Sequence, residues 1–241
     1  MSTSFWISLA TAVTTGVFAV FVLARYQVRR RWHLLAWGVG LVLYSLSSLA
    51  QALLVSDFNG FLFKFWYWAG AVAVAPWLGQ GTMFLLARRK KWTWISFWAI
   101  IVLCVLSLPL IFGADLNASA YQLDVALSEQ FQNIFITTGI ARTIRVVLVI
   151  VLNTYGTLLL VGGAVYSAFI FWRKRVLMNR MWGSVLIAIG GLLPAMGGFL
   201  ILLGSPDFKY WGQLFGGLIL FAGFLVATKG EPVPQKKAKT A

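Results

Sequence analysis

The stretch VVLVIVLNTYGTLLLVGGAVYSAFIFW at 146–172 decides the fold, because it runs for 27 residues without one ionisable side chain. About 20 apolar residues in a helix suffice to cross roughly 30 Å of hydrocarbon. Arg145 and Arg173 flank the stretch directly. A long uncharged segment between two arginines predicts a membrane-spanning helix.

Six other stretches of the 241-residue chain have the same character, and none of the seven contains Asp, Glu, Lys, Arg or His. The predicted spans are 5–24, 34–55, 65–87, 93–112, 146–172, 181–204 and 210–228. Only 11% of the residues are charged, against about a quarter in soluble domains. The sequence therefore predicts an all-α membrane protein whose seven transmembrane helices form one domain, 1–228.

The positive charges predict the orientation of these helices. Of the 20 Lys and Arg residues, sixteen fall in the connections after the first, third and fifth spans and in the tail 229–241. The other four are Lys64, Arg142, Arg145 and Lys209. The positive-inside rule then places the N-terminus outside and the C-terminus in the cytoplasm, as expected for a multi-pass protein of the plasma membrane.

The net charge of +14 raises the question of a partner. A basic balance favours nucleic acid in a soluble protein, but here the cations sit between membrane spans, so we expect no nucleic acid partner. The lipid bilayer is the expected surrounding. The basic connections either set topology alone or also bind anionic lipids or a protein partner.

The longest connection, 113–145, has a pattern of its own. Its apolar residues follow helical spacing with polar residues between them, which predicts an amphipathic helix on the outer surface or capping the bundle. Such a helix is either a lid over an outward pocket or a plain interfacial helix. The apolar residues are Leu123, Leu127, Phe131, Ile134 and Phe135.

A faint internal repeat appears at an offset of 145 residues. It aligns Trp37-Gly38 with Trp182-Gly183, and Phe63-Lys64-Phe65-Trp66 with Phe208-Lys209-Tyr210-Trp211. A real repeat would give a 3+1+3 helix plan with the fourth span as linker, as in sugar-transporting SWEET proteins. The alternative is that membrane-boundary patterns recur by chance in a bundle rich in tryptophan.

The spans lack the groups that most membrane chemistry needs. Without a carboxylate at bilayer depth, a proton relay is not expected. The lone His33 lies at a predicted membrane edge, the single Cys104 lies within a span, and no catalytic or phosphate-binding motif occurs. We therefore expect no enzyme activity, no cofactor and no metal site.

Uncharged polar side chains within the spans are the remaining candidates for a site. A buried amide is costly unless it is paired, so these groups must face the bundle interior or a pocket. One interpretation is an outward-opening site where Gln51, Asn153 and Gln213 converge, and the other is hydrogen bonding between helices. The candidate ligand-binding residues are Gln51, Gln80, Asn153, Tyr155 and Gln213.

Several long stretches resemble known membrane proteins. The segments WYWAGAVAVAPWLGQGTMFLLARRKKW (66–92), NTYGTLLLVGGAVYSAFIFWRKR (153–175) and GLILFAGFLVA (217–227) resemble uncharacterised bacterial seven-helix integral membrane proteins. The region ARYQVRRRWHLLAWGVGLVLYSLSSLAQALL (24–54) is similar to the seven-helix N-terminal sensor regions of bacterial histidine kinases. With only 13 residues after the last predicted span, the resemblance implies a sensor that signals through a separate protein.

Three functions are therefore expected, in this order. The first is a receptor-like module for a small apolar, neutral or amphiphilic ligand that enters from outside or from the lipid. The second is a transporter of a neutral solute built on the 3+1+3 repeat. The third is an accessory subunit that packs within a larger membrane complex.

Overall fold

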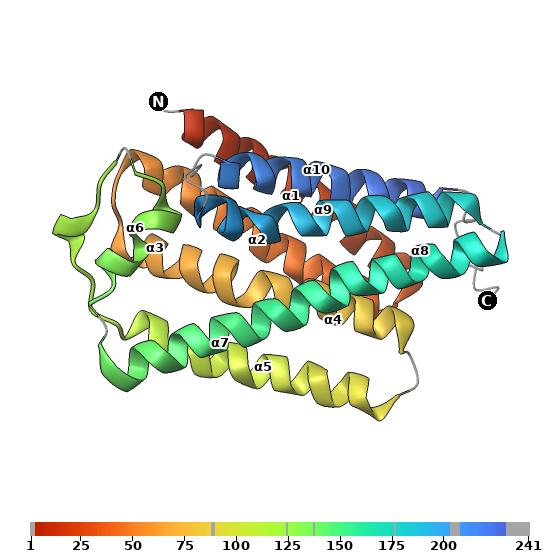
Figure 1. Ribbon diagram of the computed structural model, residues 1–241, viewed down its shortest axis with the longest axis horizontal. Coiled ribbons are helices and arrows are strands. Elements are labelled where there is room, and N and C mark those ends of the chain that lie inside the picture. Colours follow the sequence, from red (N-terminus) through yellow and green to blue (C-terminus); the bar gives the residue numbers. More distant parts are fainter. Residues whose placement is uncertain are drawn as a thin grey trace, which may run out of the picture.

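A computed structural model describes residues 3–87, 90–123, 125–136, 138–175, 177–202 and 208–229, and it is helical almost throughout, with no sheet in these ranges (Figure 1). At 197–202 and 208 it describes the backbone alone. The elements are α1 (Thr3–Arg29), α2 (Trp32–Ser56), α3 (Gly60–Trp66), η1 (Tyr67–Ala73), α4 (Val74–Leu86), α5 (Lys91–Phe112), η2 (Ala118–Ala120), α6 (Leu127–Ile134), α7 (Gly139–Thr157), η3 (Leu158–Gly162), α8 (Gly163–Lys174), α9 (Met178–Leu202) and α10 (Phe208–Thr228).

Within the described ranges, six helices are long and apolar enough to cross a membrane. They are Thr3–Arg29, Trp32–Ser56, Gly60–Leu86, Lys91–Phe112, Gly139–Lys174 and Lys209–Thr228. The chain is therefore a multi-pass helical membrane protein in contact with a lipid bilayer. The predicted span 181–204 overlaps α9, which is 25 residues long. Residues 203 and 204 lie outside the described residues, as does the predicted tail beyond Lys229.

The long helices lie along one common direction, with α5 at the edge of the bundle and α10 beside α9 (Figure 1). The N-terminus and α6 lie at one end, whereas the α4–α5 and α8–α9 connections lie at the other (Figure 1). Arg25 at the end of α1 donates from Nη2 to the Thr228 carbonyl at the end of α10 over 3.4 Å. The described basic connections thus gather at one end; Arg88 and Arg89 lie outside the described residues.

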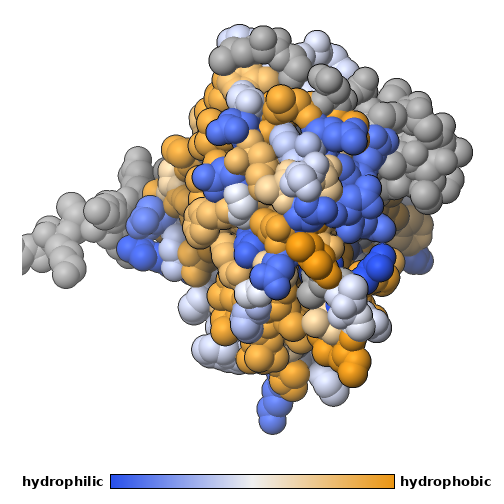
Figure 2. All heavy atoms as spheres, turned by 90° about the vertical axis from the view of Figure 1, so that its left-hand side faces the viewer, coloured by the Kyte–Doolittle hydropathy of each residue, from blue (hydrophilic) through white to orange (hydrophobic). Residues whose placement is uncertain are grey.

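The end that carries α6 has a mixed surface. Seen from this end, hydrophilic residues are interspersed with hydrophobic ones (Figure 2). The flanks of the long helices, by contrast, expose large apolar side chains such as Val147 and Ile150 of α7. This distribution is typical of a bundle whose sides face lipid and whose ends face water.

The segment 113–145 divides differently from the prediction. Its α-helix, α6, covers only Leu127–Ile134, and Leu123 is an exposed residue of the preceding loop. The helix α7 begins at Gly139, so that Arg142 and Arg145 belong to it instead of to a loop.

Arginine is accommodated in α7 by aromatic rings. The guanidinium carbon of Arg145 lies 4.0 Å from the centre of the Phe135 ring and 5.8 Å from that of Tyr67. Cation–π contacts of this kind stabilise a charge that has lost water. Gly139–Lys174 is also 36 residues long, or roughly 54 Å at 1.5 Å per residue. The helix is therefore longer than the hydrocarbon of a bilayer is thick.

The bundle is tightest where glycines of α4 and α7 meet. A Cβ atom added to Gly79 would lie 2.7 Å from the Cα atom of Gly156, and one added to Gly156 would clash with the backbone of Ala75. Small residues allow helix backbones to approach this closely in a membrane. This crossing fixes the position of α7 against α4.

Candidate functional site

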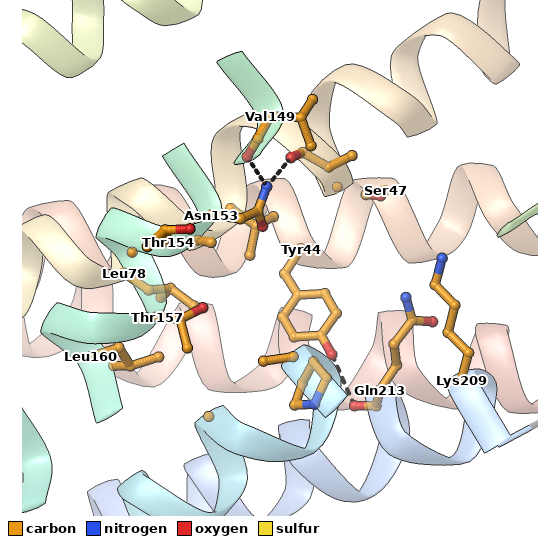
Figure 3. A pocket seen from close by; sticks show the side chains of 18 of the residues that line it. Tyr44, Ser47, Leu78, Val149, Asn153, Thr154, Thr157, Leu160, Lys209 and Gln213 are labelled. Atoms are coloured by element: carbon orange, nitrogen blue, oxygen red, sulfur yellow. Dashed lines mark hydrogen bonds between the residues drawn. The ribbon is translucent and has the colours of Figure 1, made fainter. Parts of the chain in front are cut away.

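A cavity of about 630 Å³ lies between α2, the α3–η1–α4 helix, the α7–η3 helix, α9 and α10 (Figure 3). Its volume is typical of a small-molecule site, which spans roughly 300–1,000 Å³. The lining residues are Tyr44, Ser47, Trp66, Tyr67, Gly70, Ala71, Val74, Ala75, Leu78, Phe131, Val149, Asn153, Thr154, Gly156, Thr157, Leu158, Leu160, Gly191, Pro194, Ala195, Lys209, Gln213 and Leu220.

Both π-helical segments border this cavity. The segment η1 (Tyr67–Ala73) contributes Tyr67, Gly70 and Ala71, and η3 (Leu158–Gly162) contributes Leu158 and Leu160. Single π turns within α-helices are rare and occur frequently at functional sites.

Proline and asparagine explain how η1 is stabilised. In the π pattern the carbonyl of Ala71 would receive the backbone N–H of residue 76, but Pro76 has none. Asn153 of α7 replaces this donor, since its Nδ2 atom donates to the Ala71 carbonyl over 2.5 Å and to the Val149 carbonyl over 2.9 Å. The amide thus joins α7 to the irregular segment across the cavity wall (Figure 3).

Several polar atoms on the wall have no partner among the described residues. The Oδ1 atom of Asn153 accepts no hydrogen bond there, because both bonds of this amide start at Nδ2. The hydroxyl groups of Thr154 and Thr157 also line the cavity without a hydrogen bond to the described chain. Polar groups withdrawn from water are normally paired, so these atoms are available to water or a ligand in the cavity.

The opposite wall carries Tyr44 and Gln213 (Figure 3). The hydroxyl of Tyr44 donates to the backbone carbonyl of Gln213 over 2.9 Å. The side-chain oxygen of Gln213 accepts from Nε2 of Gln51 over 3.3 Å. The Nε2 atom of Gln213 donates no hydrogen bond within the described chain, so it faces the cavity as a spare donor.

Gln51 lies behind this wall. It is only 2% exposed, donates to the Ser8 hydroxyl over 3.3 Å, and accepts from the Trp66 indole over 3.1 Å. With its bond to Gln213, this amide connects α1, α2, α3 and α10. It therefore holds Gln213 in place and is not itself among the lining residues.

Gln80 and Tyr155 belong to a different cluster, which we call the closed network: Gln80, Thr93, Ser96 and Tyr155. The amide of Gln80, fully buried, donates to the Thr93 carbonyl over 2.8 Å. Its oxygen accepts from Ser96 over 3.0 Å and from the Tyr155 hydroxyl over 2.6 Å. The network links α4, α5 and α7 away from the cavity.

Lys209 lines the cavity, although its position between the predicted spans 181–204 and 210–228 predicts a connection outside the membrane. Its Nζ atom lies 5.5 Å from the centre of the Trp66 ring. The signal that would have found it is its position between aromatic residues, in Phe208-Lys209-Tyr210-Trp211, which resembles the pattern around Lys64.

The helix α6 closes one end of the cavity. Leu127 and Ile134 lie on the buried face of this helix, while Phe131 lines the cavity and packs against Tyr67 with ring centres 5.6 Å apart. Tyr121, in the loop before α6, donates from its hydroxyl to the Leu54 carbonyl. Burial, and then the nearby Asp57 carboxylate, raise the pKa of Tyr121, so this donor stays protonated at neutral pH.

The cavity reaches the flank of the bundle between α7–η3 and α9. Thr154 and Ala195 line it and are exposed, and Leu158 lines it although 67% of its surface is exposed. Among the described residues, the cavity therefore opens on the apolar side of the bundle, between α7–η3 and α9.

Of the five residues predicted from sequence, Asn153 and Gln213 line the cavity on opposite walls, and Gln51 bonds to Gln213 from behind. Gln80 and Tyr155 lie together in the closed network. Comparison of the chain with family models, with curated proteins and with solved structures finds no match. In the described ranges, no three His, Cys, Asp or Glu side chains gather as a metal site would require.

Proposed function

We propose that the protein is a receptor-like module of the plasma membrane that binds a small, largely apolar ligand in this cavity and acts through a separate partner protein, without enzyme activity. The single observation that carries the proposal is the cavity itself: about 630 Å³, with apolar walls and spare polar atoms on both sides. A mostly apolar pocket with a few convergent polar groups is the usual form of a ligand site.

The proposal includes seven crossings, with the N-terminus outside. The helix α9 runs beside α10 and would be the seventh span in addition to the six apolar helices. The described basic connections share the end opposite α6, which supports a cytoplasmic location for that end under the positive-inside rule.

The contrast with other polar groups supports a ligand. Gln51 and Gln80 satisfy their amides with protein partners, as structural groups do. By contrast, the oxygen of Asn153 and the hydroxyls of Thr154 and Thr157 have no hydrogen-bond partner in the described chain and are available to a ligand in the cavity.

Transport of a neutral solute is less well supported. The 145-residue offset relates η1, residues 67–73, to residues 212–218, which are regular α-helix in α10. The irregular turns that border the cavity therefore do not follow the repeat. An accessory role would leave the cavity without a purpose.

Native mass spectrometry of the protein purified in mild detergent tests the proposal. We expect a bound small molecule that is lost in Ala75→Phe, which fills the cavity, and retained in Ala168→Phe, a matched change in a half-buried alanine of α8 that does not line it. A wild-type protein with an empty cavity, or equal retention in both variants, would contradict the proposal.

A further inference from the structure

The cation on the cavity wall limits the chemistry of the ligand. Within the described residues, Lys209 makes no hydrogen bond or ion pair, and its contact is the face of Trp66. A buried ammonium is costly unless an anion pairs with it. Among the described residues that line the cavity there is no Asp or Glu that would provide one.

A second donor lies next to Lys209. Gln213 follows it by four residues, on the same face of α10, and the two side chains point into the cavity together (Figure 3). The oxygen of Gln213 is occupied by Gln51 over 3.3 Å, which leaves the Nε2 atom for a ligand. This corner of the cavity therefore offers donors and a positive charge, and it suits an acceptor with negative charge.

Apolar side chains form most of the remaining wall. From Lys209 the lining continues along α10 to Leu220, eleven residues or roughly 16 Å further at 1.5 Å per residue. Leu78 and Leu160 line the same region from α4 and η3, and both are buried. A hydrocarbon chain would replace water there favourably.

The entrance agrees with a ligand that comes from the lipid. Phe131 and α6 close the outer end, whereas Thr154, Leu158 and Ala195 expose the cavity on the apolar flank. A molecule dissolved in the bilayer would reach this opening directly, with its polar head at the level of Lys209.

We propose that the ligand is a single-chain amphiphile with an acidic headgroup, a carboxylate or a phosphate, held by Lys209 and Gln213 with its chain among the leucines. This inference rests on the proposed function and names the class of its ligand. It narrows the apolar, neutral or amphiphilic ligand expected from sequence to an acidic amphiphile, because Lys209 lines the cavity.

Titration calorimetry on the protein in phosphatidylcholine nanodiscs tests the inference, with empty nanodiscs as the partition control. The probes are dodecanoate, 1-lauroyl-lysophosphatidate and the neutral 1-dodecanol. The variants are Lys209→Gln and, as a matched control, Lys64→Gln, whose lysine donates to the Phe112 carbonyl over 2.9 Å and does not line the cavity.

We expect at least one acidic probe to bind about tenfold or more tightly than dodecanol, as a charged hydrogen bond contributes. Lys209→Gln should remove this preference, and Lys64→Gln should retain it. Tighter binding of dodecanoate would identify a free acid, and tighter binding of the lysophosphatidate a lipid headgroup.

Equal binding of acidic and neutral probes to the wild type, or a preference that survives Lys209→Gln, would overturn the inference. If Ala75→Phe then still abolished binding of dodecanol, the proposed cavity function would stand without the acidic headgroup. Absence of saturable binding by every probe would also overturn the inference, and the native mass spectrum would decide the proposed function separately.

Discussion

The closed network and the cavity wall use the same kinds of side chain with opposite results. In the closed network, one amide oxygen of Gln80 accepts two hydroxyls and its nitrogen finds a carbonyl. On the cavity wall, Asn153 uses only its nitrogen, and its oxygen faces open space. An amide in a membrane span therefore does not by itself indicate a site. The better indicator is an amide whose donor or acceptor atoms have no partner in the protein.

The two regions also differ in what surrounds them. The closed network lies where α5 packs onto α4 and α7, with Thr93 almost fully buried. The cavity lies where α7 and α9 contact each other little and each packs mainly on other helices. Separation of these two helices leaves the space that the polar atoms face.

The substitution with the largest expected effect disrupts the packing of the closed network and of the cavity wall together. Gly156 lines the cavity and contacts the α4 backbone next to Tyr155. Gly156→Leu should force α7 away from α4 and lower the free energy of unfolding by at least about 3 kcal/mol. Denaturant titration in detergent measures this. Gly162→Leu is the control, since a Cβ atom there meets nothing within 4 Å; equal losses would refute the role of the crossing.

A change confined to the closed network should alter stability without altering binding. Gln80→Leu leaves the Tyr155 hydroxyl without its acceptor and removes one bond each from Ser96 and the Thr93 carbonyl, which still bond to each other over 3.0 Å. We expect a loss of about 2 kcal/mol in unfolding free energy. The copurifying molecule in the native mass spectrum should be unaffected. Its loss from a folded Gln80→Leu protein would show that the two regions are not independent.

A change on the cavity wall should give the reverse pattern. Asn153→Leu removes the amide and should abolish ligand occupancy in the native mass spectrum, while the loss of the bond to Ala71 reduces stability by only about 1 kcal/mol. Expression should be preserved. Full occupancy in this variant would contradict the assignment of Asn153 to the site.

The smallest effect is expected at Thr157. Thr157→Val removes a hydroxyl without a partner in the described chain, so the unfolding free energy should change by less than about 0.5 kcal/mol. Occupancy should fall measurably, whereas Thr14→Val, on α1 and away from the cavity, should leave it unchanged. A stability loss as large as that of Gln80→Leu would show that Thr157 is paired.

The sequence was sufficient to predict a membrane protein and the positions of most of its helices, because uncharged apolar stretches of this length are characteristic of membrane-spanning helices. It failed at the start of α7. Hydropathy excludes Arg145 from the predicted helix, but the helix includes it because its guanidinium packs on the rings of Phe135 and Tyr67. Aromatic partners from distant segments are not visible in a local pattern.

For the site, polarity selected Asn153 and Gln213, and both line the cavity. It selected Gln80 and Tyr155 for the same reason, although 75 residues separate them and they bond to each other. Which amides bond to each other depends on the rotation of each helix about its own axis. Hydropathy does not reveal this rotation. Lys209 escaped notice because a lysine near aromatic residues is usual at a membrane boundary.

The two π turns also bear on how the chain tolerates changes in length. A π turn holds one residue more than an α turn, so the helix accommodates an extra residue there locally. Deleting one residue within Tyr67–Ala73 should therefore restore an uninterrupted α-helix and spare the register on either side. The same deletion in the middle of α2 would turn every later side chain of that helix by about 100°, so we expect length changes to be tolerated better at the π turns beside the cavity than there.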